Sequence, residues 1–217
     1  MPRSATGRAL FPLLVTVLLA GCASTYYKAM EKVGVHKRDI LVDRVEGARD
    51  AQSDAQDRFK SALDQFSAVV NVGDSDLKTA YERLDAEFEG AQEAARRVSD
   101  RIAKVESVAE ALFAEWEDEL KLYSNARLRR SSEAKLHDTR RRYDAMLASM
   151  RKAEASMAPV LDTFRDNVLF LKHNLNAQAV GALKIEFSAL KRDIDELIRD
   201  MNTSIESSDQ FIARIRE

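Results

Sequence analysis

The sequence feature that most constrains the fold is an apolar repeat with alternating steps of four and three residues, which begins near Leu41. Its longest set has only apolar or aromatic members: Tyr81, Leu84, Phe88, Ala91, Ala95, Val98, Ile102, Val105, Ala109, Leu112 and Trp116. Residues at this spacing lie along one face of a helix and meet a facing helix, as they do in coiled coils. The repeat therefore predicts long helices packed side by side, with Trp116 and the phenylalanines as core residues.

The breaks in this repeat predict where the helices end. Because the chain has only 7 glycines and 3 prolines in 217 residues, we expect few breaks and long elements. At the first break, Gly73 can adopt the left-handed conformation that ends a helix, and Asp74 or Ser75 can cap the next one. The repeat weakens again between residues 120 and 139, which we interpret as a second hairpin; one continuous helix is the alternative. A third turn is expected at residues 174–176.

These breaks predict four helices, at about residues 36–71, 75–123, 128–174 and 178–217. Pro159 lies inside the third helix, but the apolar phase continues across it, so we expect one kinked helix rather than two. Short connections make neighbouring helices antiparallel. The predicted fold is all-α: a single elongated, antiparallel coiled-coil or up-down four-helix bundle over residues 36–217. Its two longer middle helices should extend beyond the start of the first helix.

The N-terminal residues have the features of a secretory signal, with Arg3 and Arg8 ahead of an apolar stretch from residue 9 to residue 20. That stretch is too short to span a membrane, which takes roughly 20 apolar residues. It ends in Leu19-Ala20-Gly21-Cys22, which resembles the bacterial lipobox, where the cysteine carries diacylglycerol. We therefore predict a signal peptide at residues 1–21, a lipid on Cys22 and a tether at residues 22–35. The alternative is an ordinary secreted protein in which a cysteine falls there by chance.

Two further observations bear on this prediction. Cys22 is the only cysteine, so no intramolecular disulfide can form. Ala23, rather than aspartate, follows it, and by resemblance to lipoprotein sorting in Gram-negative bacteria this implies the periplasmic face of the outer membrane.

The charge pattern points away from nucleic acid and toward one basic cluster. A net charge of −2 disfavours nucleic-acid binding, since such domains are usually basic. The cluster falls at the end of the bundle predicted to face the membrane: Arg127, Arg129, Arg130, Arg140, Arg141 and Arg142. These residues either contact anionic lipid headgroups or form a solvated helix end together with Glu133 and Asp138. Both interpretations stay open.

We find no motif of catalysis or metal binding. His36, His137 and His173 lie far apart in the sequence, without partners at metal-ligand spacing, and read as surface residues. There is no nucleophile elbow and no phosphate-binding glycine loop. We therefore expect no enzymatic activity, no metal, no small-molecule substrate and no cofactor apart from the lipid on Cys22.

Four stretches of the chain resemble the domain-of-unknown-function family 2959 of Gram-negative lipoproteins. They are the run from Tyr26 to Arg38, the runs Val42 to Val45 and Ala48 to Gln52, the Tyr-Ser-Asn and Leu-Arg-Arg-Ser-Ser runs between residues 123 and 132, and the run from Phe170 to Ala177. The resemblance implies a lipid-anchored, periplasm-facing helical protein without an assigned activity. It also implies that the turn with Asn174 and Asn176 is a shared feature, either as a recognition turn or as a pair of helix caps.

These observations lead us to expect a lipid-anchored helical scaffold or interaction protein that binds an envelope protein or a second copy of itself. The alternative is a membrane-shaping module in the manner of BAR-like bundles. A crescent-shaped dimer would favour that alternative, and a straight monomer would favour the scaffold. The consecutive apolar residues Val168 to Leu171 are expected either to be buried on several sides or to mark an oligomer contact.

Overall fold

The computed structural model describes residues 36–71 and 77–216. In these residues it contains four helices and no strand: α2 (Lys37–Asn71), α3 (Leu77–Leu120), α4 (Ala126–His173) and α5 (Ala177–Arg216). Every helix boundary lies within three residues of its predicted place, and the all-α prediction is confirmed. The predicted signal peptide, the lipid site Cys22, the tether and the turn at Gly73 lie outside the described residues.

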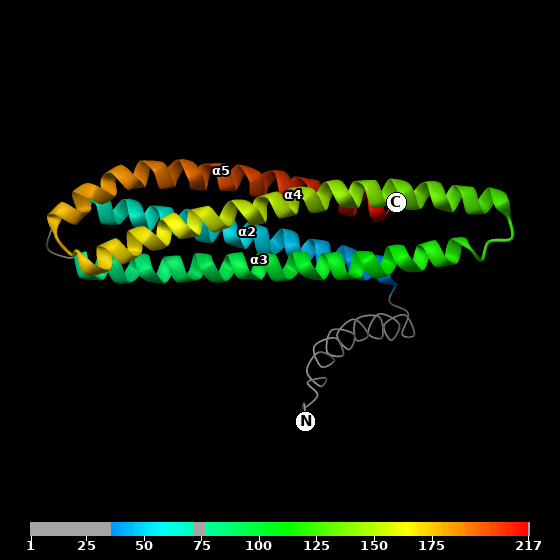
Figure 1. The fold of residues 1–217 in the computed structure, drawn as a ribbon, viewed down its shortest axis with the longest axis horizontal. Coiled ribbons are helices and arrows are strands. Elements are labelled where there is room, and N and C mark those ends of the chain that lie inside the picture. The colour runs from blue at the N-terminus through cyan, green and yellow to red at the C-terminus, as the bar shows by residue number, and fades with distance from the viewer. Residues whose placement is uncertain (1–35, 72–76, 217) are drawn as a thin grey trace, which may run out of the picture.

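The four helices form an elongated antiparallel bundle (Figure 1). Each helix packs against the next one along the chain, and α5 returns to pack against α2, so the ring of four closes. This is the predicted up-down bundle. It follows from the repeat, because each helix has one apolar face that must be covered by its neighbours.

The repeat residues fill the centre of the bundle. Leu84, Val98, Ile102 and Val105 are fully buried, as their spacing predicted. Near the two turns at the left of Figure 1, Phe164 packs against two rings from other helices, Phe66 and Phe88, at centroid distances of 6.1 and 5.6 Å. Fully burying a side chain of this size stabilises the fold by about 1.5–3 kcal/mol. The core therefore has a cluster of aromatic rings at this end.

A buried polar contact joins α2 to α5. Gln52, the polar member of the first repeat, accepts a hydrogen bond of 2.9 Å from the Ser204 hydroxyl, and both side chains are fully buried. One turn along, Gln56 donates to the Asn202 side chain at 2.8 Å. Polar pairs at core positions specify register, because any shift along the helix axis leaves them without partners.

Helix α4 passes through Pro159 without interruption, which confirms one helix rather than two. A hairpin at residues 121–125 separates α3 from α4 and settles the open question at the second break. The hairpin ends at Asn125, whose side chain accepts hydrogen bonds from the backbone N–H groups of Arg127 (2.9 Å) and Leu128 (3.2 Å). This side chain caps α4, because it satisfies two of the N–H groups that the first helical turn leaves without partners.

Beyond the start of α2 and the end of α5, the paired helices α3 and α4 continue alone (Figure 1). We call this two-helix part, residues 115–135, the arm. The overhang of the middle pair was predicted from helix lengths. The opposite end of the bundle, around residues 168–185, is called the far end.

Candidate functional site

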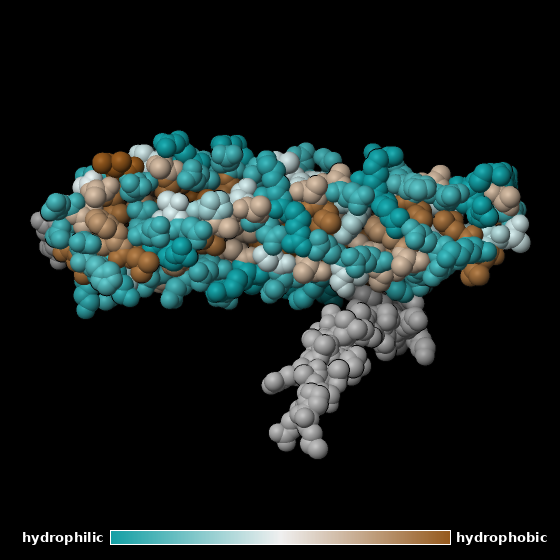
Figure 2. All heavy atoms as spheres, in the orientation of Figure 1, coloured by the Kyte–Doolittle hydropathy of each residue, from teal (hydrophilic) through white to brown (hydrophobic). Residues whose placement is uncertain are grey.

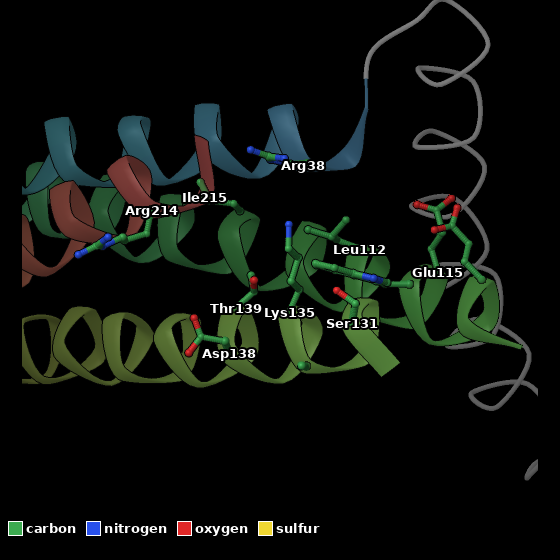
Figure 3. A pocket seen from close by; sticks show the side chains of 12 residues that line it. Arg38, Leu112, Glu115, Ser131, Lys135, Asp138, Thr139, Arg214 and Ile215 are labelled. Carbon is green, nitrogen blue, oxygen red and sulfur yellow. The ribbon is translucent and has the colours of Figure 1, made fainter. Parts of the chain in front are cut away.

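A groove lies where the four-helix bundle becomes the arm (Figure 3). It arises because α2 and α5 stop here, so that the inner faces of α3 and α4 lose the two helices that cover them elsewhere. Its volume is about 760 Å³. Leu112, Trp116 and Ile215 contribute apolar surface, and Lys135 points from α4 toward the opposite helices.

Trp116 is held at the edge of this groove. Its ring packs against the hydrophobic core, as expected, but it is only partly buried and also lines the groove. The indole Nε1 donates to the Ser132 hydroxyl at 2.8 Å, which ties α3 to α4 at the base of the arm. Trp116 is therefore a core residue on one side and a groove residue on the other.

The first residue of α2 marks the groove's other boundary. The Lys37 side chain is buried, and its ammonium lies 2.9 Å from a Glu115 carboxylate oxygen. This ion pair fixes the start of α2 against the last turns of α3. It also gives the antiparallel register of the two helices at the base of the arm.

The tip of the arm combines exposed apolar side chains with unpaired cations. Leu122 is 82% exposed and Leu128 51%, and Tyr123 is also exposed. In the first turns of α4, the described residues hold no ion pair with three members of the predicted cluster: Arg127, Arg129 and Arg130. Cations at a helix N-terminus oppose the helix dipole, so these arginines do not serve α4 itself.

The rest of the predicted basic cluster is engaged within the fold. Arg140 lies 2.7 Å from Glu117 of α3, and its guanidinium carbon is 4.9 Å from the centre of the Phe113 ring. Arg141 and Arg142 both pair with Asp138. The pKa of Asp138 lies below its usual value, chiefly because Arg142 donates a hydrogen bond to its carboxylate. The structure thus divides the six arginines into three at the tip and three at the base.

At the far end, the two predicted turn asparagines act as helix caps. The Asn174 side chain donates to the Phe170 carbonyl at 2.9 Å, and its backbone N–H donates to Leu171. The Asn176 side chain accepts from the Ala179 N–H at 3.0 Å, at the start of α5. These contacts account for both asparagines without a recognition role.

Apolar side chains around this turn are exposed instead. Leu169 and Phe170 face solvent while Val168 and Leu171 are buried, so the run from Val168 to Leu171 is not buried on several sides. Ile185 is 75% exposed. The large apolar side chains that the described residues leave exposed all lie at the arm tip or around the far end (Figure 2): Leu122, Tyr123, Leu128, Leu169, Phe170, Leu175 and Ile185.

Sequence reasoning did not assign a role to most of these residues. The run of consecutive apolar residues at Val168 was a usable signal, because a surface helix rarely carries four together. Leu122, Tyr123 and Leu128 gave no such signal, since only the overhang of α3 and α4 leaves them without cover.

The family model described as "Protein of unknown function (DUF2959)" matches residues 26–215 of the chain. The chain belongs to this family. The match covers the groove, the arm and the far end, and it extends upstream of α2 through residues 26–35. No curated protein and no solved structure matches the chain.

This DUF2959 chain shows no metal site in the residues that the structure describes. Residues 36–71 and 77–216 contain no group of three metal-ligating side chains. The three histidines are exposed and lie apart on α4 and ahead of α2. Within the same residues, no helix is both long enough and apolar enough to cross a membrane.

Proposed function

We propose that this DUF2959 protein is a lipid-anchored, non-catalytic rod of the bacterial envelope that connects a membrane to a protein partner. Cys22 would carry the diacylglycerol, the arm would face the membrane, and the far end would bind the partner. The observation that carries this proposal is the distribution of apolar surface: it gathers at the two ends of a rod whose sides are charged (Figure 2). Such a rod would bind one structure at each end and would hold the two structures at a fixed distance.

The composition of the arm tip supports the proposal that the arm faces the membrane. Tyrosine and basic residues beside exposed leucines suit the headgroup layer of a bilayer. Each of Arg127, Arg129 and Arg130 would contribute about 1 kcal/mol against anionic lipid. Residues 22–35 reach at most about 45 Å when fully extended, so Cys22 stays near the end of the bundle that carries the arm.

The exposed apolar side chains at the far end support the proposal that this end binds a protein partner. Leu169, Phe170, Leu175 and Ile185 are exposed and lie within about ten residues of the turn between α4 and α5. Contiguous exposed apolar side chains on a soluble surface commonly mark protein–protein contacts. An envelope protein is the proposed partner here, and a second copy of the chain would be recognised by a change of mass in solution.

The BAR-like alternative has less support. Such a module needs free cations along one long side of a dimer, whereas several lateral arginines in the described residues are engaged within the fold. Arg151 pairs with Glu106 and Glu154, and Arg49 with Asp209. The four helices form a straight rod rather than a crescent (Figure 1).

Metabolic labelling with a radioactive fatty acid, followed by membrane fractionation, tests the anchor. We expect the wild-type protein to take up label and to sediment with the outer membrane, and Cys22→Ser to lose both. Ala23→Asp is the matched control: it should keep the label and move to the inner membrane. Unchanged labelling of Cys22→Ser would refute the anchor, and an unmoved Ala23→Asp would refute the outer-membrane assignment.

Photo-crosslinking in cells tests the partner end. A photoreactive residue at Ile185 should give a discrete adduct with another protein, whereas one at Asp57, an exposed side position on α2, should not. The same adducts from both positions, or none from Ile185, would contradict a partner at the far end.

A further inference from the structure

The groove at the base of the arm has the size of a small-ligand pocket. Its volume of about 760 Å³ falls within the range of roughly 300–1,000 Å³ that is usual for such pockets. Residues of all four helices line it, so a ligand in the groove would contact parts of the chain that are distant in sequence. Pockets of this kind combine mostly apolar surface with a few polar groups that orient the ligand. The lining residues therefore indicate which class of ligand fits.

Apolar surface runs from the groove toward the arm tip. Leu112 and Trp116 line the groove, and Leu120 follows them at the same step of four, so the three side chains share one face of α3. Leu120 packs against the core but is only partly buried, and Leu128 of α4 is exposed at the tip. An elongated apolar ligand such as a single acyl chain can follow this surface, whereas a compact polar ligand would leave it uncovered.

Most of the acidic groups of the groove are neutralised within the fold. Glu115 pairs with the buried Lys37 at 2.9 Å, and Asp138 pairs with two arginines of its own helix. Glu119 also lines the groove, and it holds no ion pair in the described residues. The carboxylates of the groove therefore offer little attraction to a cationic ligand.

Two cations, by contrast, line the groove from opposite walls. Arg38 lies on α2 and Lys135 on α4, and the Lys135 side chain points toward α2 (Figure 3). Neither side chain holds an ion pair in the part of the chain that the structure describes, whereas Arg214, the remaining lining cation, is engaged in a contact of its own. Arginine and lysine bind a carboxylate through charge-assisted hydrogen bonds. With two such cations against Glu119, the groove has one positive charge left for a ligand carboxylate.

We propose that the groove binds a long-chain fatty-acid anion. Its carboxylate lies between Arg38 and Lys135 and supplies the negative charge that these two side chains lack. Its chain follows Trp116 and Leu120 toward the arm tip and covers apolar surface that the ends of α2 and α5 leave open. This goes beyond the proposed function, because it requires neither a lipid on Cys22 nor a particular direction of the rod.

Photolabelling of the purified full chain with a fatty acid that carries a diazirine in its chain tests the site. We expect the label on the peptides of α3 and α4 that line the groove, and competition by unlabelled palmitic acid. Methyl palmitate, which has no charge, and inorganic phosphate, which has no chain, should compete much less. Equal competition by methyl palmitate would overturn the role of the two cations, and label confined to other peptides would overturn the site.

Charge removal in the groove tests the two cations separately from the chain. Arg38→Gln/Lys135→Gln changes two exposed side chains and should lower the labelling about tenfold, because a hydrogen bond to a charged group contributes roughly that much to affinity. Arg58→Gln/Lys152→Gln is the matched control: it makes the same replacements at exposed positions of the same two helices, outside the groove. Equal labelling of the two double variants would contradict the proposal.

A substitution that fills the groove tests the apolar part without removing a core residue. Ala134 of α4 lines the groove and is exposed, so Ala134→Phe should block the labelling and keep the circular-dichroism spectrum of the wild type. Ala145→Phe, at an exposed alanine of the same helix outside this groove, should leave the labelling unchanged. If both variants are labelled like the wild type, the chain does not lie in the groove.

Other occupants of the groove would give distinct results. If a second copy of the chain fills it, labelling should fall as the protein concentration rises and dimers form in sedimentation equilibrium. If another segment of the same chain fills it, the groove peptides should stay unlabelled at every concentration of the fatty acid. Either result would overturn the proposal.

Discussion

The bundle and the arm are built from the same two helices, α3 and α4, yet they obey different rules. In the bundle, the repeat residues are buried and many lateral charges are paired, as with Lys152 and Asp200 at 2.7 Å. In the arm, Leu122 and Leu128 are exposed and the arginines of the first turns have no acidic partner in the described residues. The difference fits the proposal that the bundle holds the fold together and the arm tip contacts a membrane.

Helix dipoles sharpen this comparison. At the far end, α4 finishes with Lys172 and His173 in its last turn, the sign that a helix C-terminus favours. In the arm, α3 ends in acidic residues with no base in its last turn, and α4 begins with arginines and no acid in its first turn. Both helices at the tip thus carry the sign that their own dipoles disfavour.

The largest expected contrast is between a core phenylalanine and a tip leucine. Phe164→Ala removes a fully buried ring that contacts Phe66 and Phe88, and should lower the free energy of unfolding by about 3–5 kcal/mol. Leu128→Ala, at an exposed site, should change it by less than about 0.5 kcal/mol. Urea unfolding followed by circular dichroism measures both, and similar losses would remove the distinction between bundle and arm.

The second contrast lies inside the bundle, at the polar contact between α2 and α5. Ser204→Ala leaves the buried Gln52 carbonyl oxygen without its donor and should cost about 1–3 kcal/mol. Adding Gln52→Leu removes the stranded amide and should recover most of that loss. If the double variant is no more stable than Ser204→Ala, the contact does not depend on polar satisfaction.

The third prediction is a double substitution that should stabilise the protein, whereas most substitutions destabilise proteins. Arg127→Glu/Arg130→Glu should raise the stability of the protein by about 0.3–1 kcal/mol per site, because acids suit the first turns of α4. The same variant should bind anionic vesicles less than wild type in co-sedimentation. Arg141→Glu, which breaks a pair with Asp138 at the base of the arm, is the matched control and should not share the gain in stability.

The smallest effect concerns pH. Burial alone would raise the pKa of Asp200, but hydrogen bonds from Lys152 and Ser156 outweigh it and hold that pKa below its usual value of 3.8. A carboxylate with a depressed folded pKa stabilises the fold above its unfolded pKa and loses that contribution as pH falls through the folded one. Asp200→Asn should therefore unfold more easily than wild type at pH 7, and the two midpoints should converge in acid. A constant difference would assign the effect to packing.

The sequence was sufficient to predict the four-helix bundle and the turn between α4 and α5. The repeat gave four helices, the hairpin near Asn125 was one of two alternatives, and the overhang followed from helix lengths. The groove could not be predicted, because it depends on where α2 and α5 stop relative to Trp116 across four helices. The division of the six arginines depended on partners distant in sequence, such as Glu117 for Arg140. The periodicity predicts which face of a helix is apolar. It does not predict along which part of that face a neighbouring helix is missing.

The central claim is that the arm faces the membrane and the far end faces away from it. Depth-dependent quenching by spin-labelled lipids tests it directly, with a fluorophore attached at Leu128→Cys or at Ile185→Cys in the membrane-bound protein. We predict strong quenching from the headgroup region at residue 128 and none at residue 185. Equal quenching at both positions would mean that the rod lies flat, and quenching at residue 185 alone would reverse its direction; either result would contradict the account.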